Sequence, residues 1–201
     1  MQRGQRVVIS VLVGVALAAL IAFAQTATTQ QSPAAGIAGT PIGNNFEGLI
    51  DQDSKPVDTN ALAGKYQLVF FGFTRCPSIC PTELLRVKTI LAGLTPGERA
   101  KLAPIFVTLD PARDSPKLMK DYVAMFDPSI LALSGPEETT QTTIKAWKVY
   151  AAKVDTEDGD YTVDHSAFLY FRGPDGVLLD LFDHAEPTPD VMAAVKAQIP
   201  D

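Results

Sequence analysis

Two kinds of apolar segment alternate along this chain from residue 66 onwards. Short continuous runs such as 66–73 (YQLVFFGF) and 103–109 (APIFVTL) are typical of strands buried on both faces of a sheet. Between them, apolar residues recur at helical spacing, as in 82–93. We expect strands at 66–73, 103–109 and 129–134, helices at 82–93, 116–126, 139–152 and 189–199, and a hairpin of 167–171 with 177–182. This order predicts an α/β domain with a central sheet and flanking helices.

Local turn chemistry supports two of these boundaries. Ser115 followed by Pro116 is a helix start, with the serine as N-cap and the proline at the first helical position. The sequence 173–176 (GPDG) is a turn between the two strands of the predicted hairpin.

The N-terminal segment has a different pattern. Residues 7–24 carry no charge and follow Arg3 and Arg6. As a helix, 18 residues span about 27 Å, close to the roughly 30 Å hydrocarbon core of a bilayer. The length favours a single-pass membrane anchor, whereas 22–24 (AFA) fits a signal-peptide cleavage site. Both readings export the rest of the chain, to the periplasmic face of the inner membrane or an equivalent intermembrane space.

The remaining chain divides into a linker and one domain. Residues 25–42 are polar and small, contain Pro and Gly, and lack apolar periodicity, which is typical of a flexible tether. We therefore expect a membrane anchor or signal segment at 1–24, a tether at 25–42 and a single domain at 43–201.

Composition and charge exclude two classes of protein. A chain that is 46% hydrophobic and 20% charged is not disordered throughout. The net charge is −6, and it becomes −8 without residues 1–24, which hold two basic and no acidic residues. Binding to nucleic acid needs a basic face that neutralises phosphates, so we expect no nucleic-acid partner.

Cys76 and Cys80 are the only cysteines, and they lie where the first long strand ends and its helix begins. In open α/β sheets, ligands gather at this edge. We expect Cys80 to precede the first helical turn and Pro81 to occupy it, so that the helix dipole and Arg75 favour thiolates. A structural disulfide is the alternative in an oxidising compartment, but so short a loop gains little stability from one.

A metal bound by two thiolates needs a further ligand, and an imidazole is the natural one. His165 lies just ahead of the strand at 167–171, whereas His184 lies in a polar loop, where we expect it to be solvated. Two sulfurs and one imidazole favour copper(I), with zinc as a competitor. From the residues alone, a dithiol without metal also remains open.

Three segments together resemble the Sco/SenC family of copper proteins. They are 70–83 (FFGFTRCPSICPTE), which carries the CxxxCP signature, 108–116 (TLDPARDSP), and 161–166 (YTVDHS), which the GPDG turn follows. The resemblance extends from about residue 42 to the C-terminus. One departure is Asn44-Asn45, where many relatives carry Gly-Pro before the first strand.

The resemblance implies a thioredoxin-like fold and one copper ion, Cu(I) or Cu(II) or both, held by Cys76, Cys80 and His165. It places Asp110 near that site, although the same residue also fits a role in its own turn. The implied function is a metallochaperone that delivers copper to the binuclear copper site of cytochrome c oxidase subunit II, or prepares the thiols of that site. Other copper chaperones or thiol oxidoreductases are further implied partners, besides the membrane contacted through residues 7–24.

Two enzymatic functions compete with copper binding. In a thiol–disulfide reductase, Cys76 and Cys80 would be the catalytic redox dithiol, acting on subunit II or on another exported protein. Thioredoxin-type motifs have two residues between their cysteines, and the three found here lean towards a metal site. A thiol peroxidase is disfavoured, because the peroxiredoxin segment that 80–83 (CPTE) resembles has a threonine where this chain has Pro77.

Overall fold

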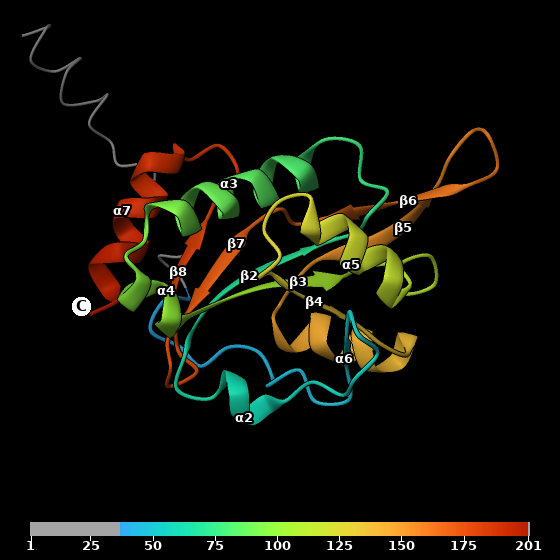
Figure 1. The fold of residues 1–201 in the computed structure, drawn as a ribbon. Helices are drawn as coiled ribbons and strands as arrows, with labels where there is room; N and C mark the ends of the chain where they lie inside the picture. Colours follow the sequence, from blue (N-terminus) through green and yellow to red (C-terminus); the bar gives the residue numbers. More distant parts are fainter. Residues whose placement is uncertain (1–36, 201) are drawn as a thin grey trace, which may run out of the picture. The chain divides into compact units, whose positions relative to one another are not determined.

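A six-stranded sheet forms the centre of the computed structural model, which describes residues 37–200 (Figure 1). The strand order is β1-β4-β3-β2-β7-β8. The strands are β1 (Ile50–Asp51), β2 (Tyr66–Gly72), β3 (Leu102–Thr108), β4 (Leu131–Ser134), β7 (Leu169–Arg172) and β8 (Leu178–Phe182). The three middle strands β4, β3 and β2 run parallel, and the outer strands pair antiparallel with their neighbours. A central sheet with helices is the predicted α/β arrangement.

Helices cover the sheet on two sides; Figure 1 shows α3 and α7 above it and α6 below it. The helices are α2 (Thr59–Leu62), α3 (Ile79–Gly93), α4 (Pro96–Lys101), α5 (Pro116–Ala124), α6 (Glu137–Ala146) and α7 (Thr188–Gln198). The core between the layers is strongly apolar along β2, where Leu68, Phe70 and Phe71 are all fully buried. The continuous apolar run that predicted this strand exists because both of its faces are covered.

Both turn predictions are confirmed. The Ser115 hydroxyl accepts a hydrogen bond from the backbone N–H of Leu118, and Pro116 is the first residue of α5. In the hairpin of β7 and β8, the Gly173 N–H donates to the carbonyl of Val177 at 2.8 Å. Gly176 has a φ of +84°, a conformation that glycine adopts without steric cost.

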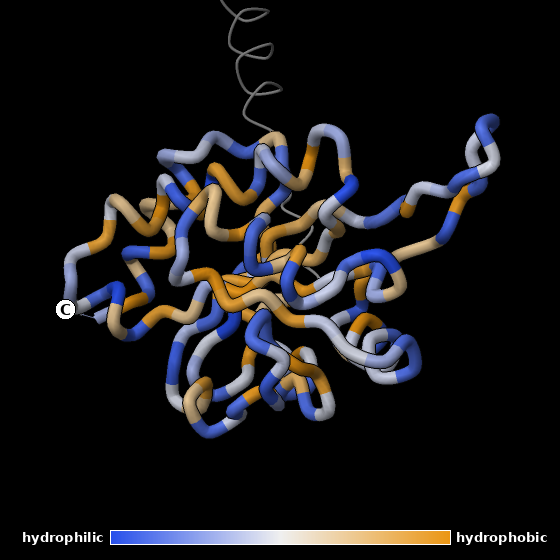
Figure 2. The backbone as a smooth tube through the Cα atoms, turned by 45° about the vertical axis from the view of Figure 1, so that its right-hand side comes forward, coloured by the Kyte–Doolittle hydropathy of each residue, from blue (hydrophilic) through white to orange (hydrophobic). Residues whose placement is uncertain are grey.

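The predicted helix at 139–152 is wrong in its second half. It ends at Ala146, and the chain then forms a separate two-stranded antiparallel sheet of β5 (Ala151–Asp155) and β6 (Tyr161–His165). Trp147 is fully buried and stacks on Phe46, with ring centroids 5.3 Å apart. This packing fixes the end of α6 more strongly than local periodicity does. Figure 2 shows the β5–β6 hairpin extending from the rest of the domain, with a hydrophilic tip.

The predicted anchor or signal segment, and most of the predicted tether, lie outside the described residues. In the part of the chain that is described, no helix has the length and apolar character needed to cross a bilayer. The described end of the predicted tether contacts the sheet, because Gly39 donates to Leu178 and Ile42 donates to Gly176 through backbone hydrogen bonds.

A buried ion pair lies on α3. Glu83 is fully buried, with its Oε2 3.4 Å from Nη1 of Arg86. Arg86 also donates to the carbonyls of Asp183, His184 and Glu186, so it ties α3 to the segment after β8. Burial raises the pKa of the Glu83 carboxyl, and the nearby Arg86 offsets only part of that effect.

We expect the stability of Glu83→Gln relative to wild type to rise with pH, so that the margin between them shifts in favour of the variant from about pH 5 to pH 8. Because the folded-state pKa is raised, the stability contributed by the protonated carboxyl is complete below the unfolded-state pKa of about 4.3 and is lost as the pH rises through the folded-state pKa. Urea unfolding between about pH 5 and pH 8 measures the margin, with the exposed Glu138→Gln as control. Parallel stability profiles for wild type and Glu83→Gln would contradict this account.

Candidate metal centre

The two cysteines lie on the connection between β2 and α3 and on the first turn of α3. The helix begins at Ile79 with Ser78 as N-cap, so Cys80 is its second residue and Pro81 its third. Our expectation that Cys80 precedes the first helical turn is therefore wrong, because Cys80 lies within that turn together with Pro81. Pro81 is tolerated because backbone N–H groups in a first turn have no acceptor within the helix.

A glycine of β2 makes room for the Cys80 sulfur. A Cβ atom at Gly72 would lie 2.7 Å from the Sγ of Cys80 and 3.0 Å from the ring of Phe106. The sulfur therefore rests directly against the backbone of the central sheet. A larger side chain at this strand position would displace it.

A buried carboxylate holds the loop that leads to the cysteines. Asp114 accepts hydrogen bonds from the backbone N–H of Thr74 at 3.1 Å, from the Thr74 hydroxyl at 2.5 Å and from the Thr108 hydroxyl at 2.7 Å. These bonds fasten the loop to the end of β3 and to the turn before α5. Burial raises the pKa of Asp114, against the effect of its hydrogen bonds. No local pattern in the sequence relates positions 74 and 114, so this role of Asp114 could not be predicted.

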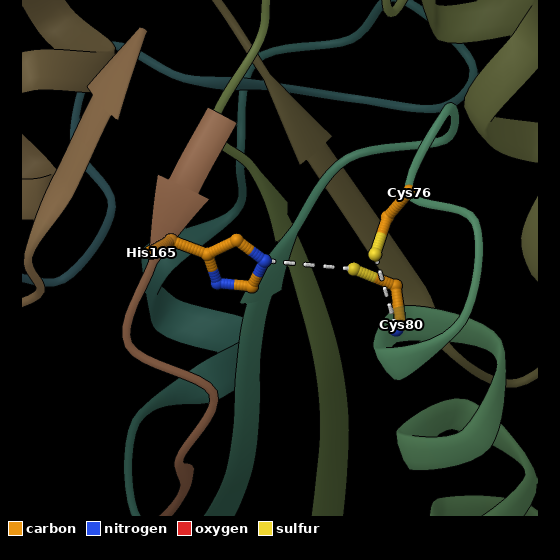
Figure 3. A group of neighbouring side chains, drawn as sticks. All are labelled: Cys76, Cys80 and His165. Carbon is orange, nitrogen blue, oxygen red and sulfur yellow. Dashed lines mark hydrogen bonds between the residues drawn. The ribbon is translucent and has the colours of Figure 1, made fainter. Parts of the chain in front are cut away.

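The structure brings Cys76, Cys80 and His165 together. Their sulfur atoms and a ring nitrogen all lie within 4.8 Å of one another. The Cys80 Sγ is 3.8 Å from Nε2 of His165, and the Cys80 backbone N–H donates to the Cys76 Sγ at 3.4 Å (Figure 3). Both cysteines are free and buried, and the histidine is half-buried. These are the three side chains that the family resemblance selected.

The orientation of His165 leaves one nitrogen available for a metal. Its Nδ1 is 3.1 Å from the carbonyl oxygen of Ser166. Because a carbonyl only accepts hydrogen bonds, this contact assigns the ring hydrogen to Nδ1 and leaves the lone pair of Nε2 facing the sulfurs. Phe70 and Phe73 contact the imidazole edge to face and hold its plane. A backbone partner of this kind is usual for a histidine that binds a metal.

The two thiols differ in acidity. Hydrogen bonding from the Cys80 side chain lowers the pKa of Cys76 to about 4 against the opposing effect of burial, with smaller contributions from the N–H groups of Cys80 and Ser78. The pKa of Cys80 is raised, because Cys76 takes the charge and because Cys80 is buried. Arg75 does not take the role that we expected, since its exposed guanidinium pairs with Asp160 at 3.4 Å.

Asp110 bonds to the strand that carries the histidine. It is fully buried, and its carboxylate accepts from the Tyr161 hydroxyl at 2.7 Å and from the Arg113 guanidinium. Arg113 also donates to the carbonyl of Tyr161 at 2.8 Å. Tyr161 is the first residue of β6 and His165 the last. Asp110 thus lies outside the group of three and positions the hairpin that presents His165.

His184 lies apart from this group, as we expected. Its imidazole is 53% exposed and pairs with the carboxylate of Asp183 at 3.2 Å. The candidate site therefore offers two soft sulfurs and one imidazole, a donor set that suits copper(I) and also zinc.

A sequence model of the SCO1/SenC family matches residues 34–200. The chain belongs to this family. A SCO2-like protein of Rickettsia felis is 34% identical over 197 residues, which cover 94% of each chain. Eukaryotic SCO1/SenC relatives are longer: the matched segment covers 59% of the Schizosaccharomyces pombe protein sco1 and 43% of an Arabidopsis thaliana homologue, so the chain spans about half the length of these curated relatives.

Solved SCO1/SenC structures share the fold. Bradyrhizobium japonicum ScoI with copper bound is 38% identical, with a TM-score of 0.68 over 80% of this chain and 98% of that one. BsSco, a member of the Sco family of cytochrome c oxidase assembly proteins in which a disulfide switch has been identified, is 27% identical with a TM-score of 0.57 over 80% and 92%. The expected thioredoxin-like arrangement is thereby confirmed.

Proposed function

We propose that this SCO1/SenC protein binds one copper ion through Cys76, Cys80 and His165 and acts in the assembly of cytochrome c oxidase, by delivering copper to the binuclear site of subunit II or maturing that site. The observation that carries this proposal is the convergence of two sulfurs and one imidazole nitrogen within 4.8 Å. Relatives of known structure support it, since ScoI of Bradyrhizobium japonicum and yeast Sco1 have been solved with copper bound.

The site suits an ion that is received and passed on. Three ligands satisfy copper(I) without closing its coordination shell, so a ligand of the receiving protein attacks before the first ones leave. The lowered pKa of Cys76 supplies a thiolate without a separate base. We place the domain outside the cytoplasm, held at the membrane by residues 7–24.

We expect His165→Ala to lower the affinity for Cu(I) at least about tenfold, or about 1.4 kcal/mol, because the site loses its only nitrogen ligand. Competition against a Cu(I) chelator measures this on the full-length chain, reduced and without oxygen. His184→Ala is the matched control, since it removes the other histidine of the chain from an exposed position. Equal affinities for wild type and His165→Ala would show that His165 is not a copper ligand.

Thiol–disulfide reduction is a second candidate function, and the unequal thiols favour it. The lowered pKa of Cys76 suits it to attack a substrate disulfide as a thiolate. Cys80, whose pKa is raised, would then be the resolving thiol that attacks the mixed disulfide. In this reaction both thiols are oxidised to a disulfide while the substrate disulfide is reduced to two thiols. If His165→Ala keeps both its copper affinity and its reduction of a disulfide substrate, the reductase takes precedence over the chaperone.

A further inference from the structure

A pocket of about 230 Å³ lies at the opposite end of β2 from the cysteines. Its walls come from Asn45, from α2 and the start of β2 up to Gln67, and from the turn 172–176. Gln67 is paired with Arg172 near the first residue of β2, whereas the last residue of that strand leads to Cys76. Figure 1 shows α2 and the connection to α3 at opposite ends of the domain. The pocket is thus separate from the metal centre.

Arg172 brings a buried positive charge to this pocket. The residue is only 8% exposed, and burial lowers the pKa of its guanidinium, which nevertheless stays protonated. Each acceptor that the described residues offer it is uncharged: the carbonyl of Gly176 at 3.2 Å, Oε1 of Gln67 at 3.2 Å, and Oδ1 of Asn45 at 3.3 and 3.4 Å. These are long hydrogen bonds, and they leave one N–H of Nη2 without an acceptor among the described residues.

The charge of the exposed Asp175 offsets only part of the cost of burying this cation, and an anion in the adjoining pocket would offset more of it. The planar guanidinium matches the paired oxygens of a carboxylate or phosphate. The pocket is smaller than the roughly 300 Å³ at which sites for drug-sized ligands begin, so it suits only a small ion. Asp175 is the one acidic residue of the lining, and it lies exposed at the rim.

We propose that this pocket binds a small oxyanion, of the size of phosphate or a short carboxylate, through the guanidinium of Arg172. The site is independent of copper and of the proposed role in oxidase assembly. It gives the domain a ligand-binding position at the end of the sheet away from the cysteines.

The fluorescence of Trp147 can report on binding at this site. Trp147 is the chain's only tryptophan and is fully buried, and its ring centroid lies 5.6 Å from the guanidinium carbon of Arg172. We expect calorimetric titration of the full-length chain in mild detergent with inorganic phosphate or malonate to give saturable binding, with a dissociation constant of roughly 1 mM. Trp147 emission should shift with the same dependence on concentration. Sodium chloride at equal ionic strength should produce neither change.

Two variants with opposite expected effects on anion affinity test whether Arg172 binds the anion. Arg172→Met should weaken binding at least tenfold, and Asp175→Asn should tighten it about two- to fivefold by removing the rim carboxylate. Lys117→Met, on the exposed face of α5, makes the same change in net charge as Arg172→Met and should bind as wild type does.

The result that overturns the proposal is a wild-type response no larger than that to chloride, or unchanged affinity in a folded Arg172→Met. Circular dichroism reports whether this variant folds, because its substitution removes hydrogen bonds from Asn45 and Gln67. If it does not fold, Asp175→Asn decides: tighter binding supports the site, and unchanged binding refutes it.

Discussion

Replacing Cys80 by serine is expected to lower the affinity for Cu(I) about a thousandfold, or about 4 kcal/mol. The Cys80 sulfur lies 3.8 Å from Nε2 of His165 and in the same group as the Cys76 sulfur. Its loss removes one of the two soft ligands and leaves the Cys76 sulfur alone with the imidazole. A serine oxygen is a hard donor and stays protonated near neutral pH, which makes it a poor ligand for copper(I). Chelator competition on the full-length, reduced chain gives the two dissociation constants.

Ser78→Ala is the control for this substitution. Ser78 lies two residues before Cys80, and its side chain makes no capping hydrogen bond to α3. It should therefore bind copper as the wild type does. A Cys80→Ser variant that binds within tenfold of wild type would refute a two-sulfur site.

Asp114→Ala is expected to cost about 3 kcal/mol or more of unfolding free energy. The substitution leaves the N–H and hydroxyl of Thr74 and the hydroxyl of Thr108 without their acceptor, and buried donors that lose a partner cost about 1–3 kcal/mol each. Urea unfolding should show a lower midpoint with an unchanged slope.

The matched control is Asp121→Ala on α5, whose carboxylate is 64% exposed and pairs with Lys117. Exposed pairs contribute about 0–1 kcal/mol, so this variant should unfold close to wild type. Equal losses in both variants would mean that the Asp114 bonds do not stabilise the loop before the cysteines.

The central sheet could be predicted from sequence because its strands are buried on both faces. In β2 and β3 burial makes nearly every position apolar, and a continuous run survives in the sequence. The β5–β6 hairpin is the opposite case. The residues of β5 are half-buried or exposed, so no burial pattern marks the strand, and the tertiary packing of Trp147 decides where the preceding helix ends.

For the candidate site, the residue types alone were not enough. The spacing of Cys76 and Cys80 indicated a dithiol at a strand end, and its place before a strand made His165 the better candidate of the two histidines. The family resemblance was needed to identify it as a ligand, because its sequence neighbours give no sign of the sulfurs that it faces. The hydrogen bond of Asp114 with Thr74 joins residues 40 positions apart, and that of Arg172 with Asn45 joins residues 127 positions apart. No local signal encodes such contacts, because each partner taken alone is an ordinary polar residue.

The attachment of the β5–β6 hairpin to the domain predicts the order in which the ligands of the proposed copper site exchange. Both cysteines belong to the main body, where Cys80 lies against the central sheet. His165 is on a two-stranded ribbon, a structure with little stability of its own, held in part by the polar contacts of Tyr161 with Asp110 and Arg113. β5 has no buried residue and β6 has one, so we expect the ribbon to open at a lower free energy than the six-stranded sheet. His165 would then be the ligand that exchanges first: an incoming ligand would bind the ion and replace the imidazole while both sulfurs still hold it.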